Sequence, residues 1–126
     1  LMDLTPNVQA MLAAMLNKPL FVALRQPANL TRAGELLQSH LEWAVAAERR
    51  GEIFASGPFV AEGTPPGSQG GMTIVRAGSH SEARKILDLD PFVSEGVVTI
   101  DLRKWAVMEG GITVSMRFSN QSARLL

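Results

Sequence analysis

The most constraining feature of this sequence is a short apolar run followed by a long amphipathic segment. Residues 20–24 (Leu-Phe-Val-Ala-Leu) are continuously apolar and follow Pro19, which predicts a strand buried on both faces. From Ala33 to Arg50 the sequence has helical spacing, and Gly51 stands where a left-handed helix terminator belongs. The residues that define this helical stripe are Leu37, Leu41, Ala44, Val45 and Glu48.

The next four segments continue the alternation of strands and helices. Residues 52–60 and 71–77 are rich in β-forming residues and flank a Gly- and Pro-rich stretch, which predicts a hairpin with a long loop. Residues 79–82 match a capping box and predict a helix to about Leu87, and residues 97–107 predict a further strand. The order strand, helix, strand, strand, helix, strand is the split arrangement of ferredoxin-like domains, so we expect an α+β fold.

Both ends of the sequence add structure to this pattern. Thr5-Pro6 resembles a helix N-cap followed by proline at the first helical position. The helix that follows has an apolar stripe, which must be covered by its own domain or by a partner: Val8, Met11, Leu12, Met15 and Leu16. Alternating apolar residues over 112–118 predict a C-terminal strand, with fraying beyond Ser119. We therefore predict a helical extension at 1–18, a domain at 19–118 and a tail at 119–126.

Charge and composition exclude several classes of function. Twelve basic and twelve acidic side chains cancel, so the chain lacks the net positive field that attracts nucleic acid or anionic lipid. The first twenty residues are interrupted by Asp3 and by 17–19 (Asn-Lys-Pro), which is neither a signal peptide nor a membrane span. Cysteine is absent, which fits a reducing compartment, so we expect a cytoplasmic protein.

No pattern in the sequence indicates a metal or a cofactor. The glycines from Gly57 to Gly71 lack the Gly-Lys-Ser/Thr ending of a phosphate-binding loop and lie between predicted strands. The two histidines, His40 and His80, are far apart in the sequence, and no tight cluster of carboxylates accompanies either. His80 belongs to the predicted helix cap, where we expect it to be solvated.

Several short motifs between Leu37 and Trp105 resemble the YciI-like family, the family of the YCII-related domain. The motifs are Ser39-His40-Leu41, Ala55-Ser56-Gly57-Pro58-Phe59, Gly70-Gly71-Met72, Asp90-Pro91-Phe92 with Gly96, and Arg103-Lys104-Trp105. The family more often has Arg-Pro-Trp at the last of these. The resemblance implies a ferredoxin-like fold that dimerises through its sheet, as in dimeric α+β barrels, with a pocket near the interface. It also implies an active centre made of a histidine and an aspartate, here His40 and Asp90.

The residues themselves leave alternatives open. His40 lies beside the apolar face of its helix, where a structural histidine is the more common case, and an Asp-Pro pair is ordinarily a helix stop or a turn. As ligand contacts we expect Ser56, Phe92 and Trp105, although a lone tryptophan is more often a packing residue. His40 and Asp90 could also simply lock the helix to the turn.

The resemblance therefore supplies the class of function. It indicates a cofactor-free enzyme in which His40 and Asp90 carry out acid/base chemistry on a small organic molecule, in a lyase, isomerase or dehalogenation type of step. The alternative is a module that binds a small ligand or regulates without catalysis. In either case we expect a homodimer, because the second face of the sheet is apolar and must be covered. We expect His40 and Asp90 to meet at the wall of a pocket.

Overall fold

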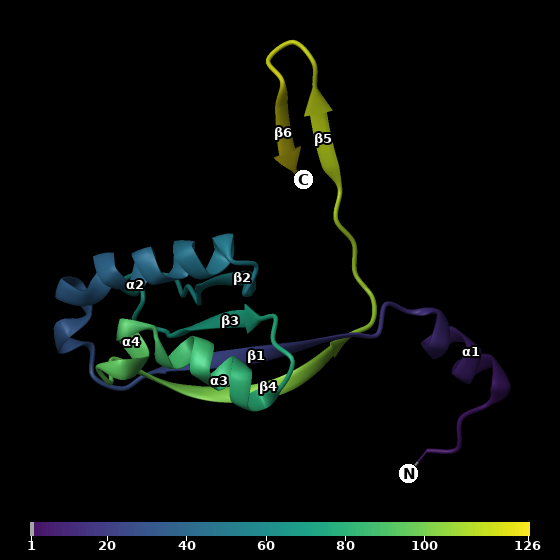
Figure 1. The fold of residues 1–126 in the computed structure, drawn as a ribbon, viewed down its shortest axis with the longest axis horizontal. Coiled ribbons are helices and arrows are strands. Elements are labelled where there is room, and N and C mark those ends of the chain that lie inside the picture. The colour runs from purple at the N-terminus through teal and green to yellow at the C-terminus, as the bar shows by residue number, and fades with distance from the viewer. Residues whose placement is uncertain (1) are drawn as a thin grey trace. The chain divides into compact units, whose positions relative to one another are not determined.

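The computed structural model describes residues 2–126 in two compact units (Figure 1). One unit is Pro19–Ala106, and the other combines residues 2–18 with Val107–Leu126. The predicted division at 1–18, 19–118 and 119–126 stays a prediction of domains, and its first residue lies outside the described part of the chain. None of the helices within residues 2–126 has the length and hydropathy that crossing a membrane requires.

The larger unit contains a four-stranded sheet in the order β2-β3-β1-β4, together with helices. Both β1 and β2 pair with β3 in the antiparallel direction. The predicted α+β fold is therefore confirmed, and the pairings of β3 are antiparallel. The elements in chain order are β1 (Lys18–Pro27), η1 (Leu30–Arg32), α2 (Ala33–Arg49), β2 (Ile53–Pro58), β3 (Gly71–Val75), α3 (His80–Asp88), α4 (Pro91–Ser94) and β4 (Val98–Val107).

The core forms where the helices cover one face of the sheet. Phe21 and Ala23 of β1, Val75 of β3 and two residues of α3 make one buried cluster, and Trp43 of α2 packs against it. Because side chains alternate along a strand, Arg25 lies on the same face as Phe21 and Ala23. The register pairs Ala23 with Thr73 and Arg25 with Gly71. Arg25 and Thr73 are therefore diagonal neighbours, and these two polar side chains meet at the edge of the core.

The apolar stripe that defines α2 faces outward. Leu37, Leu41 and Val45 are 47%, 52% and 46% exposed. The helix instead turns inward a second row that includes Trp43 and the fully buried Ala47. This row also brings His40 to a buried carboxylate, so the inward side of α2 gains a hydrogen bond as well as packing.

Two helix caps shape the chain after β3. As predicted, the Ser79 side chain accepts a hydrogen bond from the Glu82 backbone N–H at 3.1 Å and starts α3. The Glu82 carboxylate accepts in turn from the backbone N–H of Gly78 at 2.8 Å, one residue before the predicted partner. The Asp-Pro pair stops α3 as expected, but Asp90 is also the N-cap of the short helix α4, with Pro91 in its first turn.

The smaller unit contains α1 (Pro6–Ala14) and a hairpin of β5 (Val114–Arg117) and β6 (Ser122–Leu125). Thr5 caps α1 as predicted. The expected fraying beyond Ser119 is wrong, because Asn120 accepts hydrogen bonds from the Ser122 backbone N–H and hydroxyl and turns the chain back. No residue of α1 is buried, so the expected packing of its apolar stripe stays a prediction.

Candidate functional site

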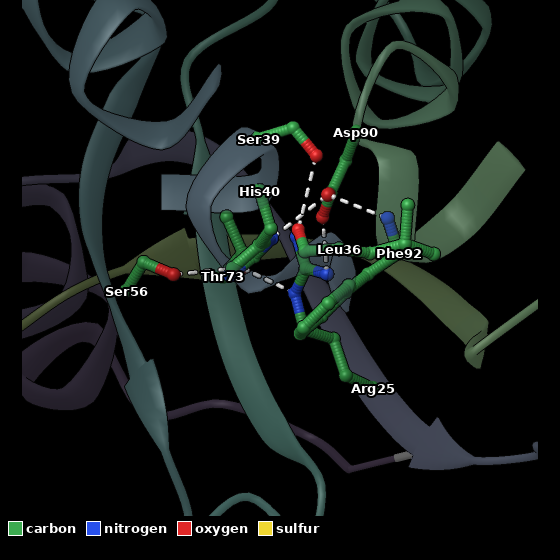
Figure 2. Close-up of polar contacts among 8 residues, drawn as sticks. All are labelled: Arg25, Leu36, Ser39, His40, Ser56, Thr73, Asp90 and Phe92. Carbon is green, nitrogen blue, oxygen red and sulfur yellow. Dashed lines mark hydrogen bonds and ion pairs between the residues drawn. The ribbon is translucent and has the colours of Figure 1, made fainter. Parts of the chain in front are cut away.

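A fully buried carboxylate, Asp90, lies at the centre of the candidate site (Figure 2). Its Oδ1 is 2.8 Å from His40 Nδ1 and accepts a hydrogen bond from the Phe92 backbone N–H at 2.9 Å. Its Oδ2 accepts a hydrogen bond from Arg25 Nη1 at 2.6 Å. Both oxygens are therefore occupied by donors from β1, α2 and the first turn of α4.

The local sequence explains why this carboxylate points inward. The Asp90 backbone N–H is hydrogen-bonded to the Leu87 carbonyl at 3.0 Å, which closes the last turn of α3. Pro91 then starts α4, and the capping bond to the backbone N–H of Phe92 fixes the Asp90 side chain. The turn predicted at Asp90-Pro91 thus orients the Asp90 side chain toward His40.

The environment of Asp90 keeps the carboxyl group ionised. Burial, the largest influence, would by itself raise the pKa of Asp90. The hydrogen bond from His40, the charges of Arg25 and His40 and the Phe92 N–H together outweigh burial, and the pKa of Asp90 is lowered. An ionised carboxylate can only accept hydrogen bonds.

His40 is held by aromatic packing as well as by Asp90. Its ring is stacked on Phe92, with ring centroids 4.1 Å apart and planes only 4° from parallel. Trp43, one turn further along α2, lies with its ring centroid 6.2 Å from that of His40. The His40 side chain is 19% exposed, so the imidazole is fixed in orientation without being sealed off.

The contact with Asp90 determines which nitrogen of His40 is available. Because the carboxylate accepts at Nδ1, a neutral imidazole carries its proton on Nδ1 and leaves a lone pair on Nε2. Nε2 is therefore the atom that could exchange a proton with a ligand. Within the described chain, no group of three or more His, Asp or Glu side chains lies close enough together to hold a metal ion.

Arg25 is the site residue that the sequence analysis missed. It is 8% exposed, and besides Asp90 it donates from Nε to the Thr73 hydroxyl at 2.7 Å. Thr73 in turn is hydrogen-bonded to Ser56 at 2.8 Å. One signal was present in the sequence, because Arg25 follows Phe21 and Ala23 at strand spacing and so falls in phase with the buried face.

Two buried donors in this cluster have no hydrogen-bond partner among residues 2–126, Arg25 Nη2 and Trp43 Nε1. The Arg25 guanidinium carbon lies 5.7 Å from the centre of the Trp43 ring, within the range of a cation–π contact. Attraction to the indole ring therefore compensates part of the burial of the Arg25 charge.

The predicted meeting of His40 and Asp90 is confirmed by their 2.8 Å contact. Phe92 also lies at this position, and Ser56 reaches it indirectly through Thr73. Trp105 does not join the cluster. It is 41% exposed and, by alternation with Leu102, lies on the opposite face of the sheet.

The two hollows that stand out on the protein lie elsewhere. One of about 360 Å³ follows the outer side of α2 at Leu41 and Val45, and one of about 400 Å³ lies on the hairpin beside Met116 and Phe118. A pocket at His40 and Asp90 therefore stays a prediction, as do the catalytic roles of the two residues.

Comparison with known proteins identifies related sequences and folds. The family model of the YCII-related domain matches residues 11–105. No curated protein was found to match the chain. Among solved structures, the chain resembles 5-chloro-2-hydroxyhydroquinone dehydrochlorinase from Burkholderia phenoliruptrix AC1100 in complex with 2,5-dihydroxybenzoquinone. That likeness has a TM-score of 0.53 at 20% identity and covers 68% of this chain and 92% of the other, which shows a shared fold.

Proposed function

Since this chain belongs to the family of the YCII-related domain, we propose that it is a cofactor-free enzyme in which His40 and Asp90 perform acid/base chemistry on a small organic molecule. The observation that carries the proposal is the 2.8 Å contact between His40 Nδ1 and a fully buried Asp90. A histidine oriented by a carboxylate and partly open to solvent is a recurrent arrangement for proton transfer near neutral pH.

The two residues would divide the work. Asp90 is buried and its oxygens already accept three hydrogen bonds, so it would orient His40 and would not touch the substrate. His40 Nε2 would take a proton from the substrate or return one to it. Lyase, isomerase and dehalogenation steps share this transfer. In the loss of hydrogen chloride, for example, a base accepts the proton while the carbon–chlorine bond breaks and chloride leaves.

Phe92 and Ser56 support a ligand site beside His40. Phe92 covers one face of the imidazole, so an aromatic ligand could extend the same stack. The Ser56 hydroxyl could offer a hydrogen bond to a polar substituent. The solved dehydrochlorinase was studied with a dihydroxybenzoquinone, and small hydroxylated ring compounds are accordingly the first substrate class to test.

A ferredoxin-like domain that dimerises through its sheet is the assembly we propose. The element order β1-α2-β2-β3-α3-β4 and the strand order β2-β3-β1-β4 support that topology. The face of the sheet opposite the helices is apolar where Leu24, Met72 and Trp105 lie, and a twofold partner is its simplest cover. Trp105 would then belong to the interface, and a cytoplasmic location fits the absence of cysteine.

The enzyme proposal is tested with a panel of chlorinated and non-chlorinated hydroxyhydroquinones, measuring substrate consumption and chloride release. His40→Ala should lower turnover at least about 100-fold, the usual lower bound for general acid/base catalysis. His80→Ala is the matched control, because His80 is the other histidine and is exposed. Equal rates for His40→Ala and the wild type would contradict the proposal, and saturable binding without turnover would favour the binding module.

A further inference from the structure

We propose that Arg25 is a positioning residue of this site, which holds the Asp90 carboxylate so that His40 keeps its proton on Nδ1 and presents Nε2 to the substrate. Its catalytic consequence rests on the function proposed above, but its effect on His40 can be measured without any substrate. The proposal assigns a role to a side chain on β1 that is 65 residues from Asp90 in the sequence.

Arg25 is the third donor to the Asp90 carboxylate. Oδ1 serves His40 and the Phe92 backbone N–H, and Oδ2 has Arg25 as its partner. The bond from Arg25 therefore holds the oxygen that neither His40 nor the Phe92 N–H contacts. At 2.6 Å and from a charged donor, it belongs to the strong class of hydrogen bonds.

Arg25 can act as a fixed anchor because it is held in turn by the sheet. Its Nε donates to Thr73 on the neighbouring strand β3, and Thr73 is hydrogen-bonded to Ser56 on β2. The backbone also approaches closely here, since a Cβ added at Gly70 would collide with the Arg25 carbonyl oxygen. The position of the guanidinium therefore follows from the register of three strands.

The charge of Arg25 affects His40 through the protonation state of Asp90. The Arg25 and Asp90 side chains are 8% and 0% exposed, and an isolated buried carboxylate is strongly disfavoured against its protonated form. Together with the hydrogen bonds from His40 and the Phe92 N–H, the charge of Arg25 keeps Asp90 ionised. A protonated Asp90 could donate to His40 Nδ1, and the ring would then carry its proton on Nε2, the atom that must accept one from the substrate.

A purely structural role for Arg25 makes a different prediction. As a staple between β1 and the start of α4, Arg25 would affect only stability, and the tautomer of His40 would survive its removal. The tautomer is thus the property that separates the two roles. The chain is well suited to this measurement because it has only two histidines, His40 and His80.

The experiment is long-range ¹H–¹⁵N correlation NMR of the histidine rings at about pH 8.5, above the usual range of imidazole titration. In the wild type we expect a single Nδ1–H tautomer for His40. In Arg25→Met the ratio of the tautomers should shift at least about tenfold toward Nε2–H, because the buried carboxylate without its counter-charge has a raised pKa and, once protonated, donates to Nδ1. Arg25→Lys should restore part of the wild-type ratio, and Arg84→Met, which removes an arginine from an exposed pair on α3, should leave it unchanged.

Thr73→Val provides a second test should Arg25→Met fail to fold. It removes the acceptor of Arg25 Nε with little change in shape, and we expect a second His40 tautomer to appear. A uniform Nδ1–H tautomer in folded Arg25→Met, or in Thr73→Val, would overturn the proposal. A tautomer that shifts as expected in a protein whose turnover does not depend on His40 would instead overturn the proposed function and leave the role of Arg25 standing.

Discussion

Replacing Asp90 by asparagine isolates the charge of this carboxylate from its shape. The side-chain oxygen of the asparagine could still accept from His40 Nδ1 and from the backbone N–H of Phe92. Its amide nitrogen, however, would face Arg25 Nη1, which donates to Oδ2 at 2.6 Å in the native protein. Two donors would then oppose each other, and the charge of Arg25, only 8% exposed, would lose its partner.

The size of the effect follows from this burial. Removing one partner of a buried ion pair costs about 3–5 kcal/mol, because an uncompensated charge remains inside the protein. Domains of ordinary stability unfold with about 5–15 kcal/mol, so Asp90→Asn should remove a large share of that free energy. Adding Arg25→Met removes the stranded charge, and the double variant should be about 1–3 kcal/mol more stable than the sum of the two single effects.

Urea denaturation followed by circular dichroism measures these differences. The matched control is Asp88→Asn, which breaks an exposed pair with Arg84 on α3 whose side chains are 52% and 42% exposed, and which should cost about 1 kcal/mol or less. A cost for Asp90→Asn no greater than that of the control would refute the claim that Arg25 and Asp90 form an energetically coupled buried pair.

Three further outcomes are expected. The pKa of Asp90 is lowered in the folded protein, so its contribution to stability is complete above the ordinary pKa of 3.8 and is lost as pH falls through the folded pKa. Acid titration should therefore lower the stability of the wild type more steeply than that of Asp90→Asn. Phe92→Ala should lower turnover by freeing the His40 ring, with a smaller change in substrate affinity, which steady-state kinetics would show. Light scattering should give a dimer mass that Leu24→Asp converts to a monomer mass; a wild-type monomer at micromolar concentration would exclude the sheet-to-sheet dimer.

Much of the larger unit was predictable because its signals are local. The apolar run at 20–24, the glycine after the long helix and the cap at Ser79 each follow from preferences of neighbouring residues, and the structure contains the corresponding elements. The pairing of His40 with Asp90 was predicted by resemblance to a family, because nothing in the local sequence joins residues so far apart.

Other features depend on contacts that local patterns do not encode. The orientation of α2 does not follow from its apolar stripe. The row of Leu37 and Leu41 is the more apolar one, whereas the row of His40 and Trp43 has partners in the sheet and at Asp90. Arg25 was overlooked for the same reason. A charge in a strand normally indicates a solvated position, and only its partner on a distant turn makes it a buried residue.

The central claim is that His40 moves a proton of the substrate, and solvent exchange tests it most directly. Turnover in deuterium oxide would be followed by NMR for the wild type, His40→Ala and His80→Ala, measuring incorporation of deuterium at the reacting carbon. We predict that His40→Ala slows incorporation at least about 100-fold while His80→Ala matches the wild type. Incorporation at the wild-type rate in His40→Ala would show that another group transfers the proton and would contradict the account.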